Sequence, residues 1–146
     1  MAKLLNITEA VTIALHSMII ITQNDDKQVN VNFISDQTGS SKYHVAKILQ
    51  KLVKDGFLGS HRGPAGGFYL LHSPHDLTLL EIYEAIEGKI VNSRCPMNKA
   101  KCPFGDCVFE DMTIKMTEEF VNYLKNHTLA YYMDKKEEGR DLTKVS

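Results

Sequence analysis

The sequence predicts a mainly α-helical protein with a small β-hairpin, and three observations support this fold class. Two short amphipathic segments meet at Gly39, a glycine-rich hairpin pattern follows them, and a long amphipathic segment lies near residues 106–126. Two short helices joined by a glycine-bearing turn indicate a helix-turn-helix. A hairpin placed directly after such a motif is typical of a winged helix. We therefore expect a winged helix-turn-helix domain followed by a long dimerisation helix.

The size and composition suit one ordinary domain with an appended arm. The chain has 146 residues, of which 43% are hydrophobic and 24% charged, and a net charge of -1. Such a balance gives no global indication of nucleic-acid binding, so only a local basic patch could provide one. The apolar segment 10–22 is too short to span a bilayer, and no signal peptide is expected. We expect a cytoplasmic protein with reduced thiols and no membrane partner.

The first half of the chain is expected to form three helices. Residues 8–22 carry an apolar pattern for a mostly buried helix with Thr8 as its N-cap. The stretch 29–58 then forms the helix-turn-helix, with Gly39 at the turn, Ser40 or Ser41 capping the second helix and Gly56 ending it.

A hairpin and a fourth helix follow. Strands are expected at 57–60 and 68–71, on either side of a glycine- and proline-rich tip. Thr78 and Glu81 have the spacing of a capping box, which predicts a helix start, and Gly88 ends that helix.

The second half divides into a cysteine-bearing segment, a long helix and a tail. Pro96, Pro103 and Gly105 break the cysteine-bearing segment into a loop. From about Asp106 an apolar face with near-heptad spacing predicts a helix, which has little else in its own chain to pack on. We expect that face to bury against a second copy, although packing within the chain is the alternative. The predicted division is a DNA-binding domain (1–88), the cysteine-bearing loop (89–106), a dimerisation helix with a short C-terminal helix (107–134) and a flexible tail (135–146).

A local basic surface coincides with the predicted recognition helix and wing. Between residues 40 and 66, four lysines and one arginine are opposed by Asp55 alone. The exposed start of a recognition helix reaches base edges in the major groove, and arginine is drawn into a narrow minor groove. The candidate DNA-binding residues are Ser40, Ser41, Lys42, Tyr43, His44 and Lys47 on the helix, and His61, Arg62, Gly63 and Pro64 on the wing. The alternative is a solvated hairpin beside a lysine-bearing helix.

All three cysteines of the chain lie within one short segment. Cys95, Cys102 and Cys107 have the density of metal ligands, yet iron–sulfur clusters and structural zinc usually have four ligands. Zinc completed by His16 or Glu110, or unrelated buried thiols, are the alternatives. No nucleophile–base pair, phosphate loop or substrate-type motif is present, so neither an enzyme nor a small-molecule substrate is expected.

One stretch is similar to a known family. "HRGPAGGFYLLHSPHDLTLLEIYEAIEG", followed by a cysteine loop and "NHTLAYYM", closely resembles the bacterial repressor family that includes IscR, NsrR and CymR. The likeness runs from the first helix to about Met133. It implies a homodimer with an N-terminal winged helix, a long dimerisation helix, and binding to pseudo-palindromic sites on double-stranded DNA. It also implies two sub-types, one with an iron–sulfur cluster on three loop cysteines and one without a cluster.

The three cysteines place this chain with the cluster-bearing sub-type. Six residues separate Cys95 from Cys102 and four separate Cys102 from Cys107, whereas the family usually has more even gaps. The cluster is therefore of two-iron or four-iron type, with the choice open. The resemblance puts Glu110 where one relative has a ligand histidine, and His16 where another has one. Thr12, at the site of a third relative's aspartate, is a poor ligand.

These observations predict a dimeric transcriptional repressor that senses redox state, nitric oxide or iron–sulfur status. A non-thiolate or external fourth ligand leaves one iron open to attack, which suits a sensor. The alternative is a cluster-free regulator of the same fold, controlled by its thiols or by a protein partner.

Overall fold

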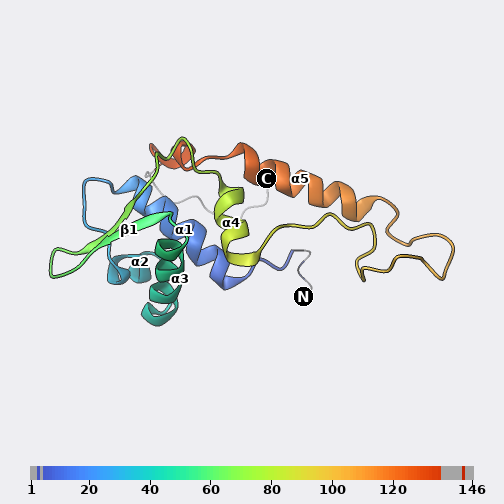
Figure 1. Ribbon diagram of the computed structural model, residues 1–146, viewed down its shortest axis with the longest axis horizontal. Coiled ribbons are helices and arrows are strands. Elements are labelled where there is room, and N and C mark those ends of the chain that lie inside the picture. The colour runs from blue at the N-terminus through green and yellow to red at the C-terminus, as the bar shows by residue number, and fades with distance from the viewer. Residues whose placement is uncertain (1–2, 4, 136–142, 144–146) are drawn as a thin grey trace.

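The computed structural model describes residues 3, 5–135 and 143, and within them the predicted mainly α-helical fold with a hairpin is confirmed. Figure 1 shows the winged-helix elements gathered at one end and the long helix α5 extending from them to the other. The order along the chain is α1 (Glu9–Gln23), α2 (Val31–Thr38), α3 (Lys42–Lys54), β1 (Leu58–His61), β2 (Gly67–Leu70), α4 (Leu79–Glu87), α5 (Met112–Asn126) and the 3-10 helix η1 (Leu129–Tyr132). None of the helices described is long and apolar enough to cross a membrane.

The turn between α2 and α3 is set by local caps. Gly39 takes a left-handed conformation (φ 73°) that glycine adopts without steric cost. The Ser41 side chain then accepts a hydrogen bond of 3.2 Å from the backbone N–H of His44, so Ser41 is the N-cap. Ser40 instead accepts a 2.6 Å bond from the Ser35 hydroxyl at its carbonyl oxygen. These bonds fix where α3 begins.

The wing, residues 58–70, is an antiparallel hairpin in which each strand lies one residue nearer the tip than the sequence predicts. Leu58 pairs with Leu70 and His61 pairs with Gly67. The N–H of Phe68 also donates a 2.8 Å bond to the carbonyl of Val29, which ties the hairpin to the segment before α2. The wing is therefore held to the body of the domain by the backbone as well as by its strands.

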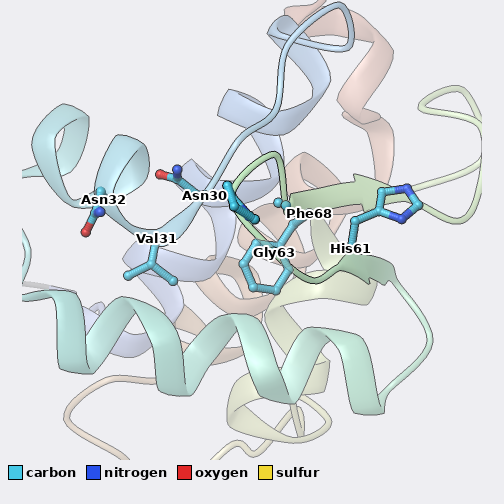
Figure 2. A pocket seen from close by; sticks show the side chains of 9 residues that line it. Asn30, Val31, Asn32, His61, Gly63 and Phe68 are labelled. Atoms are coloured by element: carbon cyan, nitrogen blue, oxygen red, sulfur yellow. The ribbon is translucent and has the colours of Figure 1, made fainter.

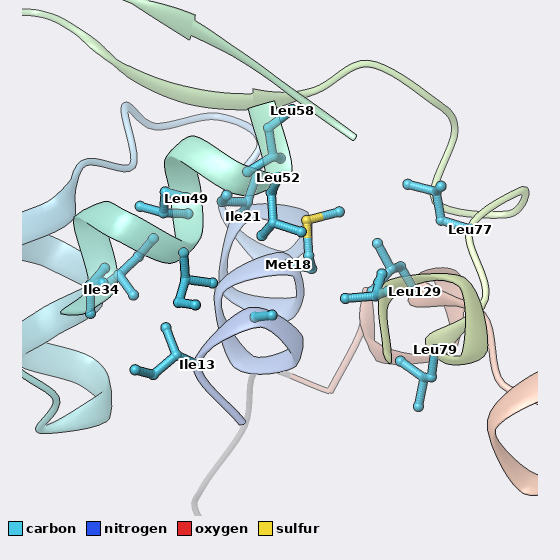
Figure 3. Close-up of a cluster of buried hydrophobic side chains, with 14 of the residues drawn as sticks. Ile13, Met18, Ile21, Ile34, Leu49, Leu52, Leu58, Leu77, Leu79 and Leu129 are labelled. Carbon is cyan, nitrogen blue, oxygen red and sulfur yellow. The ribbon is translucent and has the colours of Figure 1, made fainter. Parts of the chain in front are cut away.

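The hydrophobic core lies where α1, α3, α4 and the wing base meet, and it includes η1 (Figure 3). Met18, Leu49, Leu52, Ile82 and Leu129 are fully buried in it. Burying a side chain of this size contributes about 1.5–3 kcal/mol. Because α3 supplies Leu49 and Leu52 from its inner face, its outer face is left to the solvent.

The start of α4 is joined to the end of α5. The predicted capping box is present, since Thr78 and Glu81 each bond the other's backbone N–H. The N–H of Leu79 donates to the carbonyl of His127 at 2.9 Å, and that of Leu129 donates to Leu77 at 2.9 Å. The C-terminal end of α5 is thus fixed to the winged-helix domain.

Helix α5 begins later than the sequence indicates. It starts at Met112 rather than near Asp106, because Glu110 takes a left-handed conformation (φ 49°) that interrupts helical geometry. Val108 and Phe109, expected on the helix, lie in the preceding loop and are 90% and 54% exposed.

Part of the apolar face of α5 packs within its own chain. The rings of Tyr83 in α4 and Phe120 in α5 meet edge to face with centroids 5.5 Å apart, and Leu124 is buried. Intrachain packing, the alternative considered from the sequence, therefore covers the C-terminal half of this face, while Met112 at the other end is 56% exposed.

Candidate DNA-binding surface and cysteine loop

The outer face of α3 presents polar and basic side chains. Lys42, Tyr43 and Lys47 are exposed, and Tyr43 keeps 80% of its surface accessible. They alternate with buried Val45 and Ile48, so the helical period separates a core face from a solvent face. This arrangement suits a recognition helix, whose first turns contact base edges.

His44 differs from its neighbours on α3. Its ring Nδ1 lies 3.4 Å from Oε1 of Glu9 in the first turn of α1, and the side chain is partly buried. The sequence analysis assigned His44 to DNA without finding this contact, because the two residues are far apart in the chain. A carboxylate beside the ring competes with any phosphate or base that His44 would bind.

The tip of the wing is exposed and tightly folded. Arg62, Gly63 and Pro64 are exposed. The N–H of Gly66 donates a 2.8 Å bond to the carbonyl of Gly63, and a Cβ at Gly66 would lie 2.3 Å from the carbonyl oxygen of His61. This turn therefore requires glycine and carries Arg62 outward.

The wing and the start of α2 form a hollow of ≈ 270 Å³ (Figure 2). Its lining includes Asn30, Val31 and Asn32 from one side and His61 and Gly63 from the other. The asparagines were not predicted from the sequence, although Asn30 matches the N-cap pattern and accepts a 2.9 Å bond from the N–H of Phe33. The ring of His61 stacks on Tyr69 with centroids 4.6 Å apart, which stiffens the wing.

The cysteine loop, residues 88–111, projects beyond the N-terminal end of α5, at the opposite end of the molecule from the wing (Figure 1). All three cysteines line one hollow of ≈ 650 Å³ in this loop. Cys102 is exposed, whereas Cys95 and Cys107 are partly buried. The structure thus brings the three predicted thiols to a shared cavity.

Backbone donors favour the thiolate form of Cys95. The backbone N–H groups of Lys99 and then Met97 hold the pKa of this thiol below its usual value. Desolvation opposes them, and the charge of Lys99 adds a still smaller lowering. A thiolate is the form that binds metals. The thiol of Cys102 makes a long contact, with its Sγ 3.9 Å from the carbonyl oxygen of Asp106.

Three contacts join the first part of the cysteine loop to α5 or to its N-cap residue, Asp111. The Thr113 hydroxyl donates a 2.9 Å bond to the carbonyl of Arg94, whose guanidinium lies 3.5 Å from Asp111. The Asn92 amide donates to Glu118 at 3.4 Å. The residue before Cys95 is therefore anchored to the long helix.

The two other predicted ligands lie apart from this cavity. His16 is exposed on α1 and Glu110 is exposed in the turn before α5, and in the described chain neither lines the cysteine hollow. The residues described contain no group of three or more histidine, cysteine or acidic side chains close enough to hold a metal ion. The donor types fit an iron–sulfur cluster, but the loop must draw its thiols closer to bind one. The ligand set stays a prediction.

The fold and its exposed basic helix and wing define a winged-helix transcriptional regulator. A family model described as "Rrf2: Iron-dependent Transcriptional regulator" matches residues 7–135. The chain belongs to the Rrf2 family. This confirms the resemblance to IscR- and CymR-type regulators and the expectation that the protein is not an enzyme.

Relatives of known name agree with this assignment. The HTH-type transcriptional regulator IscR of Pectobacterium carotovorum is 26% identical over 132 residues, which are 90% of this chain and 76% of that protein. The structure of CymR, the global cysteine regulator of B. subtilis, has a TM-score of 0.72 at 18% identity and covers 92% of this chain and 100% of its own. T. potens IscR has a TM-score of 0.69 at 19% identity, covering 95% and 96%. These two likenesses establish the fold.

Proposed function

We propose that this regulator is a cytoplasmic homodimer that represses transcription and changes its operator affinity with redox state, nitric oxide or iron–sulfur supply. The observation that carries the proposal is the placement of Cys95, Cys102 and Cys107 around one cavity, in a loop bonded to α5. That helix is in turn fixed to the winged-helix domain through Leu79 and His127. A change in the conformation of the cysteine loop can therefore reach the winged-helix domain through α5.

The DNA contacts are proposed for the N-terminal end of α3, the two serines before it and the wing. Ser40, Ser41, Lys42, Tyr43 and Lys47 would face the major groove of a pseudo-palindromic operator. Arg62 at the wing tip would enter the minor groove, with His61, Gly63 and Pro64 shaping its approach. Lysine–phosphate contacts release counterions, so operator affinity should fall steeply with salt.

The three cysteines would hold an iron–sulfur cluster of two-iron or four-iron type. When bound, such a cluster supplies an iron that oxygen or nitric oxide can attack, especially where its fourth ligand is not a thiolate. His16 of a second subunit, Glu110, or an external ligand would complete the site. Residues 92–94 would transmit the state of the loop to α5 through their bonds to Thr113, Asp111 and Glu118. A coupling of about 1–3 kcal/mol suffices for a useful switch.

A homodimer is supported by the apolar side chains that α5 and the cysteine loop leave exposed. Phe104, Val108 and Met112 are 86%, 90% and 56% accessible in the single chain. Large exposed apolar patches mark interaction surfaces. In the proposed division, residues 1–88 bind DNA, the loop 89–106 holds the cluster together with the adjoining Cys107, and 107–134 dimerise. The predicted flexible tail, 135–146, lies almost entirely outside the described residues.

A second candidate is a cluster-free regulator controlled by its thiols or by a protein partner. It is favoured because the described residues contain no group of three or more histidine, cysteine or acidic side chains close enough to hold a metal ion. The chain also shares its fold with CymR, the global cysteine regulator of B. subtilis.

Anaerobic purification tests the two candidates. Coloured protein that contains iron and sulfide, and that loses colour and changes its affinity for its own upstream DNA after oxygen or nitric oxide, supports the first. Colourless protein that stays free of iron and sulfide after reconstitution contradicts it, and bound zinc would identify a structural metal instead. The variant Cys102→Ser is the control, because it should keep the fold and lose the cluster.

A further inference from the structure

The cysteine hollow has a basic character that cluster binding does not explain. Lys99 and Lys101 line it together with the three thiols, and Asp106 is the single acidic side chain of the described lining. Arg94 nearby is paired with Asp111, whereas neither lysine has a carboxylate within ion-pair distance among the residues described. The lining therefore carries an excess of positive charge beside the three thiols.

Cys102 is the thiol that a reagent in solution meets first. It is exposed, while Cys95 and Cys107 are partly buried. Its single hydrogen-bond contact is the weak 3.9 Å approach of Sγ to the carbonyl oxygen of Asp106. A small molecule can reach its sulfur without any rearrangement of the loop.

We propose that the metal-free cysteine loop is a site of S-thiolation by anionic low-molecular-weight disulfides, with Cys102 as the attacking thiol. The Cys102 thiolate attacks one sulfur of the disulfide RSSR, forms a Cys102–S–S–R bond and breaks the original S–S bond. The other half leaves as RS⁻ and takes a proton from water. The disulfide is the oxidant, so electrons balance without any further reactant. Lys99 and Lys101 attract the carboxylates of the incoming molecule.

This modification stands apart from the proposed cluster, because it needs only the thiols and the lysines. A disulfide that carries carboxylates should react faster with Cys102 than a cationic disulfide, since positive charges concentrate anionic reagents near the sulfur. The same charges are screened at high salt, so the preference should fade there.

The test uses the full-length, metal-free, reduced protein with Cys95→Ser and Cys107→Ser, so that the adduct on Cys102 cannot be resolved by a neighbouring thiol. Oxidised glutathione is the anionic probe and cystamine the cationic probe, with adducts followed by mass spectrometry. We compare this protein with versions carrying Lys99→Gln and Lys101→Gln, or, as a charge-matched control, Lys89→Gln and Lys125→Gln outside the hollow. Circular dichroism verifies that each variant is folded.

The rate ratio of glutathione disulfide to cystamine should fall about ten-fold in the Lys99/Lys101 variant and stay unchanged in the control. Asp106→Asn should raise the ratio, and about 0.5 M salt should erase the difference. In the protein with all three cysteines, peptide mapping should find the first adduct on Cys102. An unchanged ratio in the Lys99/Lys101 variant, or a first adduct on another cysteine, overturns the proposal. Since no cluster is present, neither result depends on whether the protein binds iron.

Discussion

The hydroxyl of Thr113 in α5 donates a 2.9 Å hydrogen bond to the carbonyl oxygen of Arg94, the residue directly before Cys95. This bond connects a helix to a loop that is otherwise largely exposed. Together with the Arg94–Asp111 ion pair it fixes one end of the cysteine segment. The loop can therefore change shape only between Cys95 and the start of α5, or by breaking this anchor.

Thr113→Val should loosen the anchor while keeping the shape of the side chain. A net hydrogen-bond contribution of about 1 kcal/mol corresponds to a roughly five-fold rise in local opening. We expect the initial rate of trypsin cleavage after Arg94 to rise by about that factor. Thr117→Val is the matched control, because its hydroxyl bonds only the Thr113 carbonyl within α5. Equal cleavage rates in the two variants would show that the anchor does not restrain the loop.

Arg62→Ala should weaken operator binding by about ten-fold. The side chain lies at the exposed tip of the wing, where it can enter a minor groove. The salt dependence of the affinity should also decrease by about one counterion. Fluorescence anisotropy with the upstream DNA at several salt concentrations measures both quantities, with Lys125→Ala on α5 as the control. Unchanged binding would mean that the wing does not contact DNA.

Gly66→Ala should deform the wing. Its Cβ would lie 2.3 Å from the backbone oxygen of His61, and backbone cannot move aside as a flexible side chain can. We expect a loss of about 1–3 kcal/mol in unfolding free energy and weaker operator binding. Chemical denaturation and DNA titration measure these effects. Ala65→Ser, at the exposed neighbouring position, should change neither, and wild-type behaviour of Gly66→Ala would refute the tight-turn geometry.

The pKa of Tyr83 is raised, first by burial against its surroundings and then by the charge of Glu87. A raised pKa means that the folded state holds the phenol proton more tightly than the unfolded state. The resulting stabilisation is complete below the ordinary tyrosine pKa of about 10 and is lost as pH rises through the folded-state value. Glu87→Gln removes the smaller cause, so it should lower the pKa of Tyr83 while leaving it above normal. Glutamine keeps an oxygen that can accept the hydrogen bond from the Thr8 hydroxyl.

An ultraviolet difference titration between the parent protein and Tyr83→Phe isolates this one phenol. The Glu87→Gln protein, titrated against its own Tyr83→Phe version, gives the shifted value. If both titrate at the ordinary tyrosine pKa, then Tyr83 does not sit in the partly desolvated α4–α5 contact described above.

Local sequence patterns were enough to predict most helix starts. Thr8, Ser41 and Thr78 cap their helices because cap bonds join residues three apart, which a sequence pattern displays directly. Each strand of the hairpin lies one residue nearer the tip than predicted, and Phe68 also pairs with the distant Val29, a contact that no local pattern displays. Periodicity predicts an apolar face but not a backbone reversal, so the left-handed Glu110 moved the start of α5.

The candidate site was predictable in residue type but not in geometry. The sequence groups Cys95, Cys102 and Cys107, and in the structure all three line one cavity, whereas their role as ligands stays a prediction. Contacts between residues distant in sequence, such as Thr113 with Arg94, leave no local pattern and required the folded structure. The same is true of the contact between α1 and the recognition helix.

Glu9→Gln should increase operator affinity by about two- to five-fold. Its carboxylate lies 3.4 Å from the ring of His44 on α3, where it both repels phosphates and occupies a potential DNA donor. Removing the charge frees the ring and lowers repulsion, and the gain should shrink at high salt because the interaction is exposed. Glu119→Gln on α5 removes the same charge far from α3 and is the matched control for net charge. An increase of equal size in both variants would assign the effect to net charge, and no increase in Glu9→Gln would show that His44 does not face DNA.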